Sequence, residues 1–562
     1  MKPAIKRSAL YSCIFFGCFT FLTIGRENFA LADTAGQNKV FFIDSSYDNF
    51  SREKIETVLE KVSQNAYFYI ETDFAKGLSE ADQAQLAQDI DALSFEFDNV
   101  IYPKLTTAYG SEWKKGIDND ERITIVLHRL KKAVAGYFRT EDEYPFLQAQ
   151  KSNEREMIYL NADYISKALA KSFLAHEFVH LITFNQKDRL KGLQEEVWLN
   201  EARADFASFL LGYDDDFQGS SLQQRITEFL YSSSDSLTDW ANQKSDYGIA
   251  TIFLQYVAEH YGNKIISSSM EARLVGFDSL NFALQKWGEQ KTIEQIFTDF
   301  SVAVFLNDCQ AGLEYCFRNK NLANFGVVPS LIFLSTDQIK NIAVDFTAKP
   351  WSLRWYRILA KDGDLKLAFK GAVRFRLPFV LCDKQNMCKV DFLEPKVFNT
   401  AELFLPKFAD QFYSLTLIPS VQPLIKTLSD DNQEPTYNFG LTVFLEQATS
   451  QDELTKGLLE KIEALKTQIA ILQAQLANMQ SQNNICSITK DLYFGKKNEQ
   501  VFCLQAFLQK QGQAIYPEGI ISGFFGVLTQ KAVVRFQSKY AIPATGYVGK
   551  LTKAKINSLS TQ

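Results

Sequence analysis

Apolar side chains recur at helical spacing in one central segment of the chain. Leu169, Phe173, Val179 and Phe184 alternate with polar residues, and neither Gly nor Pro interrupts the run. This periodicity predicts an α-helix across the segment. The same periodicity dominates residues 222–308, so we expect a mainly helical region there.

Residues 34–170 have a mixed pattern that predicts both strands and helices. Strand candidates are 39–43, 123–128 and 157–160, with helices between them, and 136–138 is an edge-strand candidate. An extended peptide can pair with the edge of a sheet. We therefore expect an α+β first domain with a cleft that follows the chain of a bound peptide.

Short aromatic and β-branched runs separated by turn residues follow from residue 330 to 447. This pattern predicts a small β-sandwich. Substrate binding is one role for such a module, but packing or spacing is the preferred interpretation. The runs are 351–360, 365–369, 372–381 and 413–418.

A heptad-like pattern follows, with apolar residues at alternating spacings of four and three. It predicts a coiled coil, and Ile at a positions with Leu at d favours a parallel homodimer. About three heptads are marginal alone, so a helical spacer packed on a neighbour is the alternative. The apolar positions are Leu458, Ile462, Leu465, Ile469, Leu472, Leu476 and Met479.

The final segment repeats the pattern Gly-aromatic-x-Gly-x-x-Thr, at Gly523 to Thr529 and again at Gly546 to Thr552. The glycines permit tight turns, and we expect the two threonines to cap the helices that follow. From Cys486 onward there are ten Lys or Arg and three Asp or Glu, whereas the whole chain carries −6. Anionic wall polymers would attract this basic module, and nothing in the sequence indicates nucleic-acid binding.

The N-terminal 32 residues resemble an export signal. Lys2, Lys6 and Arg7 precede the apolar stretch 9–24, and Ala30-Leu31-Ala32 fits a cleavage site. An uncleaved anchor is the alternative, and no later stretch is long enough to cross a bilayer. The 562 residues, of which 46% are hydrophobic, leave room for three or four packed domains.

The six cysteines after the signal fall into three close pairs, which predicts three local disulfides in an exported protein. Free buried thiols are the alternative. The pairs are Cys309 with Cys316, Cys382 with Cys388, and Cys486 with Cys503.

The predicted central helix carries the sequence His176-Glu177-Phe178-Val179-His180. Two histidines one turn apart face the same way and can bind one Zn²⁺, with Glu177 beside them as general base and acid. Three protein ligands leave a fourth position open, where zinc lowers the pKa of water from about 15.7 to about 7. Amide hydrolysis is the predicted reaction, and a buried structural histidine pair is the alternative.

Glu201, in the segment Trp198-Leu199-Asn200-Glu201-Ala202-Arg203-Ala204-Asp205, is the predicted third zinc ligand, and Glu196 is the reserve candidate. Asp205 lies on the same helical face as Glu201 and could orient a ligand histidine through its other ring nitrogen. An ordinary solvated helix residue is the alternative for Asp205.

These two motifs resemble those of the gluzincin group of zinc metallopeptidases, and the resemblance covers about residues 38–310. The segments 116–123 and 155–161 are similar to segments that precede the zinc motif in secreted bacterial peptidases related to hyicolysin. Thr183 and Gln186 occupy the positions where metzincins have a glycine and a third histidine, which excludes that group. The Asp118-Asn119-Asp120 turn could bind calcium, although a simple polar turn is preferred.

The gluzincin resemblance also implies a later Tyr or His that stabilises the oxyanion of the transition state. Tyr247 is the first choice, with Tyr256 and His260 behind it, and buried aromatic packing is the alternative for a tyrosine in this position. His128 is expected at a strand end without a catalytic role.

The last segment, 485–559, resembles a small three-helix peptidoglycan-binding domain. The sequence thus predicts a secreted or wall-associated zinc endopeptidase acting on proteins or peptides. A peptidoglycan crosslink hydrolase and a non-catalytic wall-binding protein are the alternatives. The expected parts are a signal peptide (1–32), a metallopeptidase domain (33–325), a β-sandwich (326–450), a coiled-coil linker (451–484) and a peptidoglycan-binding domain (485–562).

Overall fold

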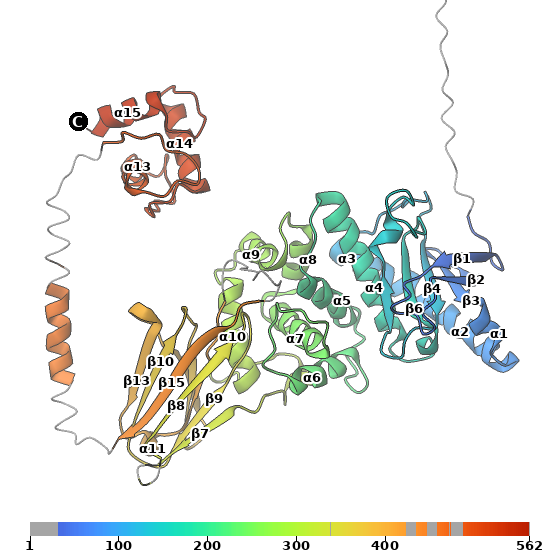
Figure 1. The fold of residues 1–562 in the computed structure, drawn as a ribbon, viewed down its shortest axis with the longest axis horizontal. Helices are drawn as coiled ribbons and strands as arrows, with labels where there is room; N and C mark the ends of the chain where they lie inside the picture. The colour runs from blue at the N-terminus through green and yellow to red at the C-terminus, as the bar shows by residue number, and fades with distance from the viewer. Residues whose placement is uncertain are drawn as a thin grey trace, which may run out of the picture. The chain divides into compact units, whose positions relative to one another are not determined.

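The computed structural model describes residues 32–560, apart from 336, 338, 423–433, 447–457, 471–472 and 474–486. Nearly all of the predicted export signal, residues 1–31, lies outside the described residues. The chain divides into two compact units, one up to Thr449 and one from Ser450 onward. Figure 1 shows the elements of both units.

A six-stranded sheet forms the N-terminal layer of the first unit (Figure 1). The three predicted strands and the predicted edge strand are confirmed as β1, β4, β6 and β5. Only helices were expected between the first two of these strands, and that expectation is wrong in part, because β2 and β3 precede the helices there. The strand order is β1-β2-β3-β4-β6-β5, and β3, β4 and β6 run parallel in the centre. The bounds are β1 Asn38–Phe42, β2 Lys54–Val62, β3 Ala66–Glu71, β4 Ile123–His128, β5 Gly136–Phe138 and β6 Met157–Asn161.

Every residue of the three central strands is buried, because both faces of the sheet are covered. Phe68, Ile125 and Ile158 point into the core shared with the helices, whereas Tyr69 and Tyr159 point into a second core on the opposite face. The N-terminal helices are α1 (Thr72–Lys76), α2 (Glu80–Glu96) and α3 (Tyr102–Tyr109).

Helices continue the first unit beyond the sheet, as the periodicity predicted. The first of them, α4, contains the paired histidines and contacts β5 and β6. The bounds are α4 Ala170–Thr183, α5 Val197–Leu211, α6 Ser221–Tyr231, α7 Lys244–Tyr261, α8 Asn263–Glu271, α9 Gly276–Lys286 and α10 Ile293–Leu306.

Two antiparallel-rich sheets follow and share one hydrophobic core, which is the two-layer arrangement that the sequence predicted. One sheet has the order β13-β10-β15-β8 and the other β12-β11-β14-β9-β7. The bounds are β7 Ser330–Leu334, β8 Asn341–Ala348, β9 Tyr356–Ala360, β10 Asp364–Gly371, β11 Pro378–Asp383, β12 Cys388–Phe392, β13 Thr400–Leu405, β14 Phe412–Leu417 and β15 Tyr437–Glu446.

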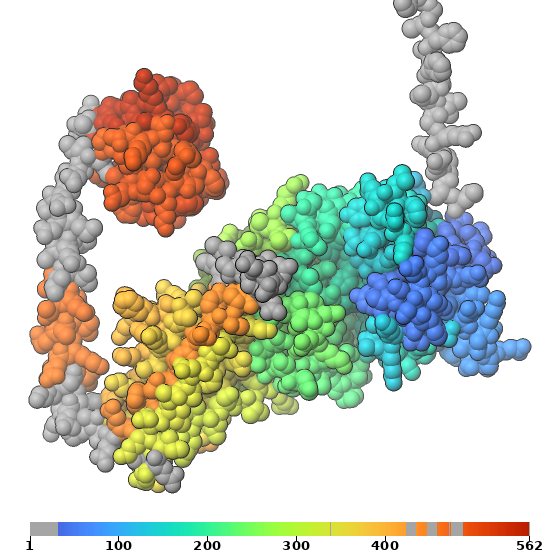
Figure 2. Space-filling model, in the orientation of Figure 1, coloured from blue at the N-terminus to red at the C-terminus, as the bar shows by residue number. Residues whose placement is uncertain are grey.

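The boundary expected near residue 325 does not separate two independent units. Trp351 of the sandwich stacks on Phe277 of α9 with ring centroids 3.7 Å apart. The indole of Trp355 donates a hydrogen bond to the Ser301 carbonyl oxygen in α10, at 2.9 Å. Because these rings belong to the same core as the helices, the sandwich and the helical region form one body (Figure 2).

Residues 458–470 of the predicted coiled coil are helical, and their apolar positions Leu458, Ile462, Leu465 and Ile469 are about half exposed. The remaining heptad positions, Leu472, Leu476 and Met479, lie outside the described residues. The coiled coil and the homodimer therefore stay predictions.

The last segment folds as three helices around its own core, as predicted. The helices are α13 (Glu499–Lys510), α14 (Val527–Lys539) and α15 (Lys550–Ser560). Gly523 and Gly546 have φ angles of 73° and 71°, so both turns use the conformation that glycine permits.

Two of the three predicted disulfides are present, Cys309–Cys316 and Cys382–Cys388. Cys503 is also disulfide-bonded, and its predicted partner Cys486 lies outside the described residues. Among the helices that the structure describes, none combines the length and the apolar character that a bilayer span needs.

Candidate metal centre and wall-binding module

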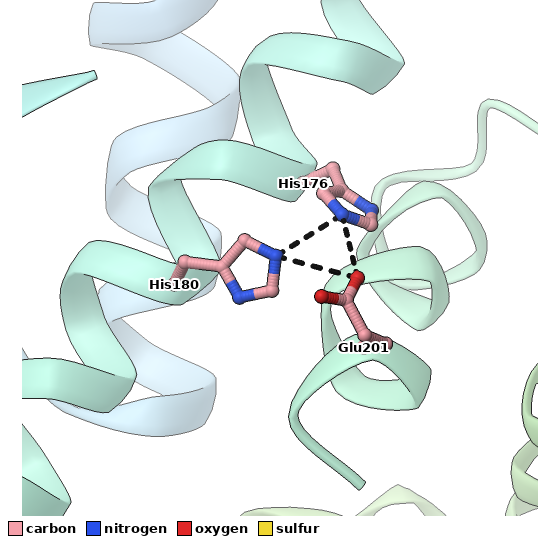
Figure 3. A group of neighbouring side chains, drawn as sticks. All are labelled: His176, His180 and Glu201. Carbon is pink, nitrogen blue, oxygen red and sulfur yellow. Dashed lines mark hydrogen bonds and ion pairs between the residues drawn. The ribbon is translucent and has the colours of Figure 1, made fainter. Parts of the chain in front are cut away.

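Three side chains from two neighbouring helices converge on one point (Figure 3). His176 and His180 project from the same face of α4, and Glu201 projects toward them from α5. The Nε2 atoms of the two histidines are 3.1 Å apart. Glu201 Oε2 lies 3.2 Å from Nε2 of His176 and 3.5 Å from Nε2 of His180.

This spacing fits the ligand shell of a zinc ion. Zinc bonds of about 2.0–2.1 Å at tetrahedral angles place ligand atoms about 3.3 Å apart. The three observed separations lie on either side of that value. Among the described residues, this is the one group of His, Cys, Asp or Glu whose ligand atoms all lie within 4.8 Å of one another.

Asp205 lies behind His176 and holds its ring in place. Its Oδ1 is 2.9 Å from Nδ1 of His176, so the histidine donates there and its Nε2 is left free to bind a metal. Arg225 donates to both oxygens of Asp205, at 2.7 and 3.0 Å, and the Thr251 hydroxyl donates to Oδ2 at 2.8 Å. Sequence reasoning missed Arg225 and Thr251, because they come from α6 and α7 and no local pattern marks them.

The carboxylates around the histidines make this a site of negative potential. Burial opposes the charged form of His176, but hydrogen bonds to Asp205 and Glu201 outweigh it and raise its pKa to about 10. Burial also opposes ionisation of Glu201, yet the nearby histidines lower its pKa below the usual range. A cation is therefore electrostatically favoured at the point where the three side chains meet.

Glu177 is buried against the edge strand of the sheet. A Cβ atom at Gly136, the first residue of β5, would lie 2.9 Å from the Cγ and Oε1 atoms of Glu177. Only glycine therefore leaves room for the carboxylate at this position. Burial raises the pKa of Glu177, while the two histidines act in the opposite direction.

The reserve ligand Glu196 is engaged elsewhere. Its Oε2 accepts a hydrogen bond from the indole of Trp198 at 2.7 Å, and it packs against Gly276. The adjacent Glu195 pairs with Arg203 and accepts the backbone N–H of Gly276 at 2.7 Å. Glu201 is thus the carboxylate that the fold brings to the two histidines.

Two tyrosines lie close enough to the candidate metal centre for its carboxylates to raise their pKa values. Burial and then the charge of Glu201 raise the pKa of Tyr247, whose hydroxyl donates to Asn242 Oδ1 at 3.1 Å. Tyr47 precedes β2, and its pKa is raised by burial and by Asp44, Glu177 and Glu201 in turn. The sequence indicated the first phenol and missed the second, because Tyr47 is far away along the chain.

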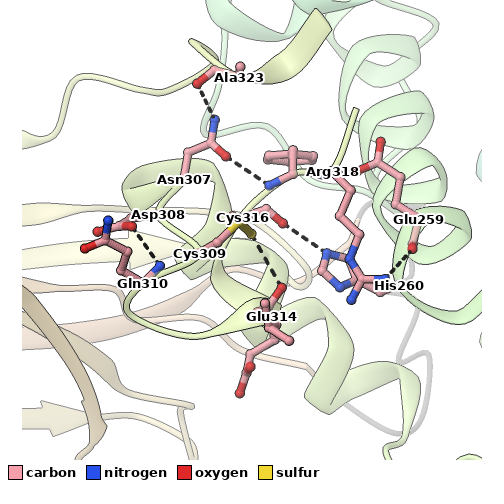
Figure 4. The surroundings of a disulfide bond; sticks show 12 residues. Glu259, His260, Asn307, Asp308, Cys309, Gln310, Glu314, Cys316, Arg318 and Ala323 are labelled. Atoms are coloured by element: carbon pink, nitrogen blue, oxygen red, sulfur yellow. Dashed lines mark hydrogen bonds between the residues drawn. A yellow bond between two sulfur atoms is a disulfide. The ribbon is translucent and has the colours of Figure 1, made fainter. Parts of the chain in front are cut away.

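The two reserve oxyanion donors contribute to packing around a disulfide. The Tyr256 hydroxyl donates to the carbonyl oxygen of Glu314 at 2.6 Å. His260 Nε2 donates to the carbonyl oxygen of Cys316 at 3.0 Å, as Figure 4 shows. Both groups hold the Cys309–Cys316 loop. His128 ends β4 as expected and is fully buried.

Two buried glutamines explain the repeated pattern of the C-terminal module. Gln505 accepts the backbone N–H groups of Ser522 and Gly523 and donates to the Thr529 hydroxyl at 2.9 Å. Gln537 repeats the arrangement with Gly546 and Thr552. The two threonines are therefore acceptors for buried amides, and the expectation that their side chains cap the helices is wrong for α14, whose N-cap is Gly526.

Comparison with known protein families identifies this module. A family model for a peptidoglycan binding domain matches residues 497–556. The chain therefore carries a peptidoglycan-binding domain near its C-terminus, which supports association with the cell wall and is consistent with an extracellular location. No curated protein matches the chain significantly.

Solved structures resemble parts of the chain only distantly. A periplasmic inhibitor of g-type lysozyme from Aeromonas hydrophila is 10% identical, with 21% of this chain and 100% of the inhibitor covered and a TM-score of 0.14. A surface-associated copper-binding protein of Methylomicrobium album BG8 is 6% identical, with 21% and 98% covered and a TM-score of 0.15. TM-scores this low carry no conclusion about fold or function.

Proposed function

We propose that the protein is a zinc-dependent endopeptidase that acts on proteins or peptides at the cell wall. The observation that carries the proposal is the convergence of His176, His180 and Glu201 within 3.1–3.5 Å, with Glu177 on the next position of the same helix. Zn²⁺ held by these ligands would supply a Lewis acid and lower the pKa of water in the open fourth position to about 7.

The protein's own residues would perform the proton transfers. Glu177 accepts a proton from the attacking water and returns it to the nitrogen of the leaving amine. The buried position of Glu177 beside Gly136 holds the carboxylate in one place. Asp205 and Arg225 keep the His176 ring oriented, and the Tyr247 hydroxyl is the proposed donor to the oxyanion.

The edge strand β5 supports the choice of an extended peptide as substrate. β5 is the last strand of its sheet, so one side of its backbone faces away from β6. An extended peptide that pairs there would run past Glu177, because Gly136 lies against that side chain. A peptide backbone is recognised in this way without regard to most of its side chains.

A matched pair of substitutions tests the proposal. Glu177→Gln should bind one Zn²⁺ per chain, as the unaltered protein does, yet lose about 10²–10⁴-fold in the rate of casein hydrolysis. Glu141→Gln, which changes an exposed glutamate, is the control and should keep full activity. Equal hydrolysis by the Glu177→Gln variant would refute the proposed mechanism.

Peptidoglycan crosslinks are the second candidate substrate, because the C-terminal module would concentrate the enzyme on the wall. Release of soluble muropeptides from purified sacculi would favour this candidate over a general protease. A protein that binds zinc and sacculi but hydrolyses neither casein nor crosslinks would instead be a wall-binding protein.

A further inference from the structure

Four carboxylates that the proposed reaction does not use gather on the first domain, away from the histidines in sequence. The charges of Glu156 and Asp118 raise the pKa of Glu143, and the charges of Asp118 and Glu112 raise that of Glu156, so Glu156 lies within electrostatic reach of the other three. We call this group the acidic cluster. Its members are Glu112, Asp118, Glu143 and Glu156.

Glu112, Glu143 and Glu156 are almost completely buried, and two of them have carboxylate oxygens without a hydrogen-bond partner among the described residues. Glu143 is 2% exposed, and neither of its carboxylate oxygens has a hydrogen-bond partner among the described residues. The Met157 N–H lies near enough to lower the pKa of Glu143, but it makes no hydrogen bond of normal geometry. Glu112 is 1% exposed, and its Oε2 atom likewise has no partner, whereas Oε1 accepts the Tyr102 hydroxyl at 2.6 Å.

Glu156 lies against the loop that carries Glu112 and Asp118. It is 3% exposed, and one of its oxygens accepts the Ile117 N–H at 2.8 Å. A Cβ atom at Gly116 would lie 1.5 Å from its other oxygen, so the backbone of the 112–118 loop lies directly against this carboxylate. Burial and the charges of Asp118 and Glu112 raise the pKa of Glu156 to about 8.

Positive side chains offset this charge only in part: Lys114 lowers the pKa of Glu112, and Arg155 and Lys39 lower that of Asp118. Arg155 Nε lies 3.5 Å from Asp118 Oδ2, but the same guanidinium makes its shorter contact with Asp33, at 2.6 Å. In the described parts of the chain, no Lys or Arg lies within 4.0 Å of the carboxylates of Glu112, Glu143 or Glu156. Buried carboxylates without partners are strongly unfavourable unless they are protonated or bind a cation.

We propose that the acidic cluster is a calcium-binding site. Its donors are all oxygens, which favours a hard cation, and Ca²⁺ accepts six to eight oxygen ligands in irregular geometry. The cluster is more open than the histidine site, whose ligand atoms all lie within 4.8 Å. A bound Ca²⁺ would draw the carboxylates inward onto bonds of about 2.3–2.6 Å.

The position of the site explains what calcium would do. Glu143 ends the short helix that follows β5, and Glu156 immediately precedes β6. Calcium would therefore fasten both ends of the β5–β6 connection to the 112–118 loop. Because Gly136 of β5 lies against Glu177, the ion would also steady the proposed substrate edge, a consequence that rests on the proposed function.

Direct calcium binding tests the site without reference to activity. Equilibrium dialysis of the exported chain against ⁴⁵Ca²⁺ should show one ion per chain, and Glu143→Gln and Glu156→Gln should each weaken binding at least about 10-fold. Glu141→Gln, an exposed neighbour in the same short helix, should bind calcium normally. Glu201→Gln should also bind calcium normally, which separates this site from the proposed zinc centre.

A thermal measurement shows whether the variants are folded. Ca²⁺ at about 100 times the Kd of the unaltered protein should raise its Tm by about 5 °C or more, and should raise the Tm of both cluster variants by about half as much or less. Their calcium-free Tm should equal or exceed that of the unaltered protein, because a neutral amide removes repulsion. Absence of calcium binding, or binding that survives both substitutions, would overturn the proposal and leave the cluster as protonated acids. Loss of casein hydrolysis in Glu177→Gln alone bears on the peptidase and not on this site.

Discussion

At the scale of single residues, the candidate metal centre includes contacts that orient its side chains, as well as the three side chains that would bind the ion. His176 is fixed by Asp205, and Asp205 is fixed by Arg225 and Thr251. Such outer contacts set the tautomer and direction of a ligand histidine. His180 has no equivalent support, since its buried Nδ1 lacks a hydrogen-bond partner among the described residues.

Asp205→Asn should therefore weaken zinc binding by about 10–100-fold while His176, His180 and Glu201 remain. The amide keeps the shape of the carboxylate, but it loses the charge that Arg225 and His176 both contact. Zinc affinity can be measured by competition with a chromogenic chelator. Asp216→Asn, an exposed change in the loop after α5, is the control, and equal affinities for the two variants would contradict the role of Asp205.

The two phenols near the centre can be told apart by kinetics. Tyr247→Phe should lower kcat by about 10²–10³-fold and leave zinc content unchanged, because only the donor to the oxyanion is removed. Tyr47→Phe should change kcat little. The reverse result would transfer the donor role to Tyr47, and full activity of both variants would exclude a phenol from the reaction.

At the scale of elements, each sequence repeat of the C-terminal module forms the same set of hydrogen bonds between a turn, a glutamine and a threonine. Each repeat places glycines in a tight turn and a buried glutamine beside it. The glutamine amide satisfies backbone groups of the turn that would otherwise be buried without partners. The threonine completes the arrangement by accepting the second amide hydrogen.

Gln505→Ala should destabilise the module by about 3 kcal/mol, because it removes the acceptor of the buried Gly523 N–H and of the part-buried Ser522 N–H. Urea unfolding of the 485–562 segment, which has a core of its own, measures the change. Gln509→Ala is the matched control, since this exposed side chain makes one hydrogen bond, to Gly519, and should cost less than about 0.5 kcal/mol. Similar losses in the free energy of unfolding for the two variants would contradict the proposed role of Gln505 in stabilising the turn.

At the scale of the whole molecule, two compact units divide the proposed tasks. The sandwich belongs to the same unit as the helices, so stacking such as that of Trp351 on Phe277 makes it a part of the body that carries the two histidines and Glu201. The peptidoglycan-binding domain lies in the second unit, with a separate core. Its excess of positive charge would attract anionic wall polymers, and the attraction should fall as salt rises.

Deletion of residues 485–562 should abolish sedimentation of the protein with purified sacculi and leave casein hydrolysis unchanged. The first effect follows from loss of the wall-binding domain, and the second from the independent core of the first unit. A pull-down at several salt concentrations measures how much protein the sacculi retain and how much of that retention is electrostatic. Retention that survives the deletion would contradict the anchoring role.

The sequence alone determined the features that depend on neighbours along the chain. The helix that carries His176, Glu177 and His180, the strands β4 and β6, and the paired cysteines could be predicted because spacing and side-chain type are local properties. The strand β3 is buried on both faces, which removes the alternation that marks a strand. The strand β2 does alternate, with Ile55, Thr57 and Leu59 buried at every second position, so its local signal was present and was overlooked.

The tertiary structure decided what depends on distance between remote segments. It brought Glu201 and not Glu196 to the histidines, placed Arg225 behind Asp205, and moved Tyr256 and His260 to the disulfide loop. It also gathered Glu112, Glu143 and Glu156, which share no motif. Electrostatic and ligand contacts form through space over a few ångströms, whereas sequence spacing specifies geometry only within one helix or strand.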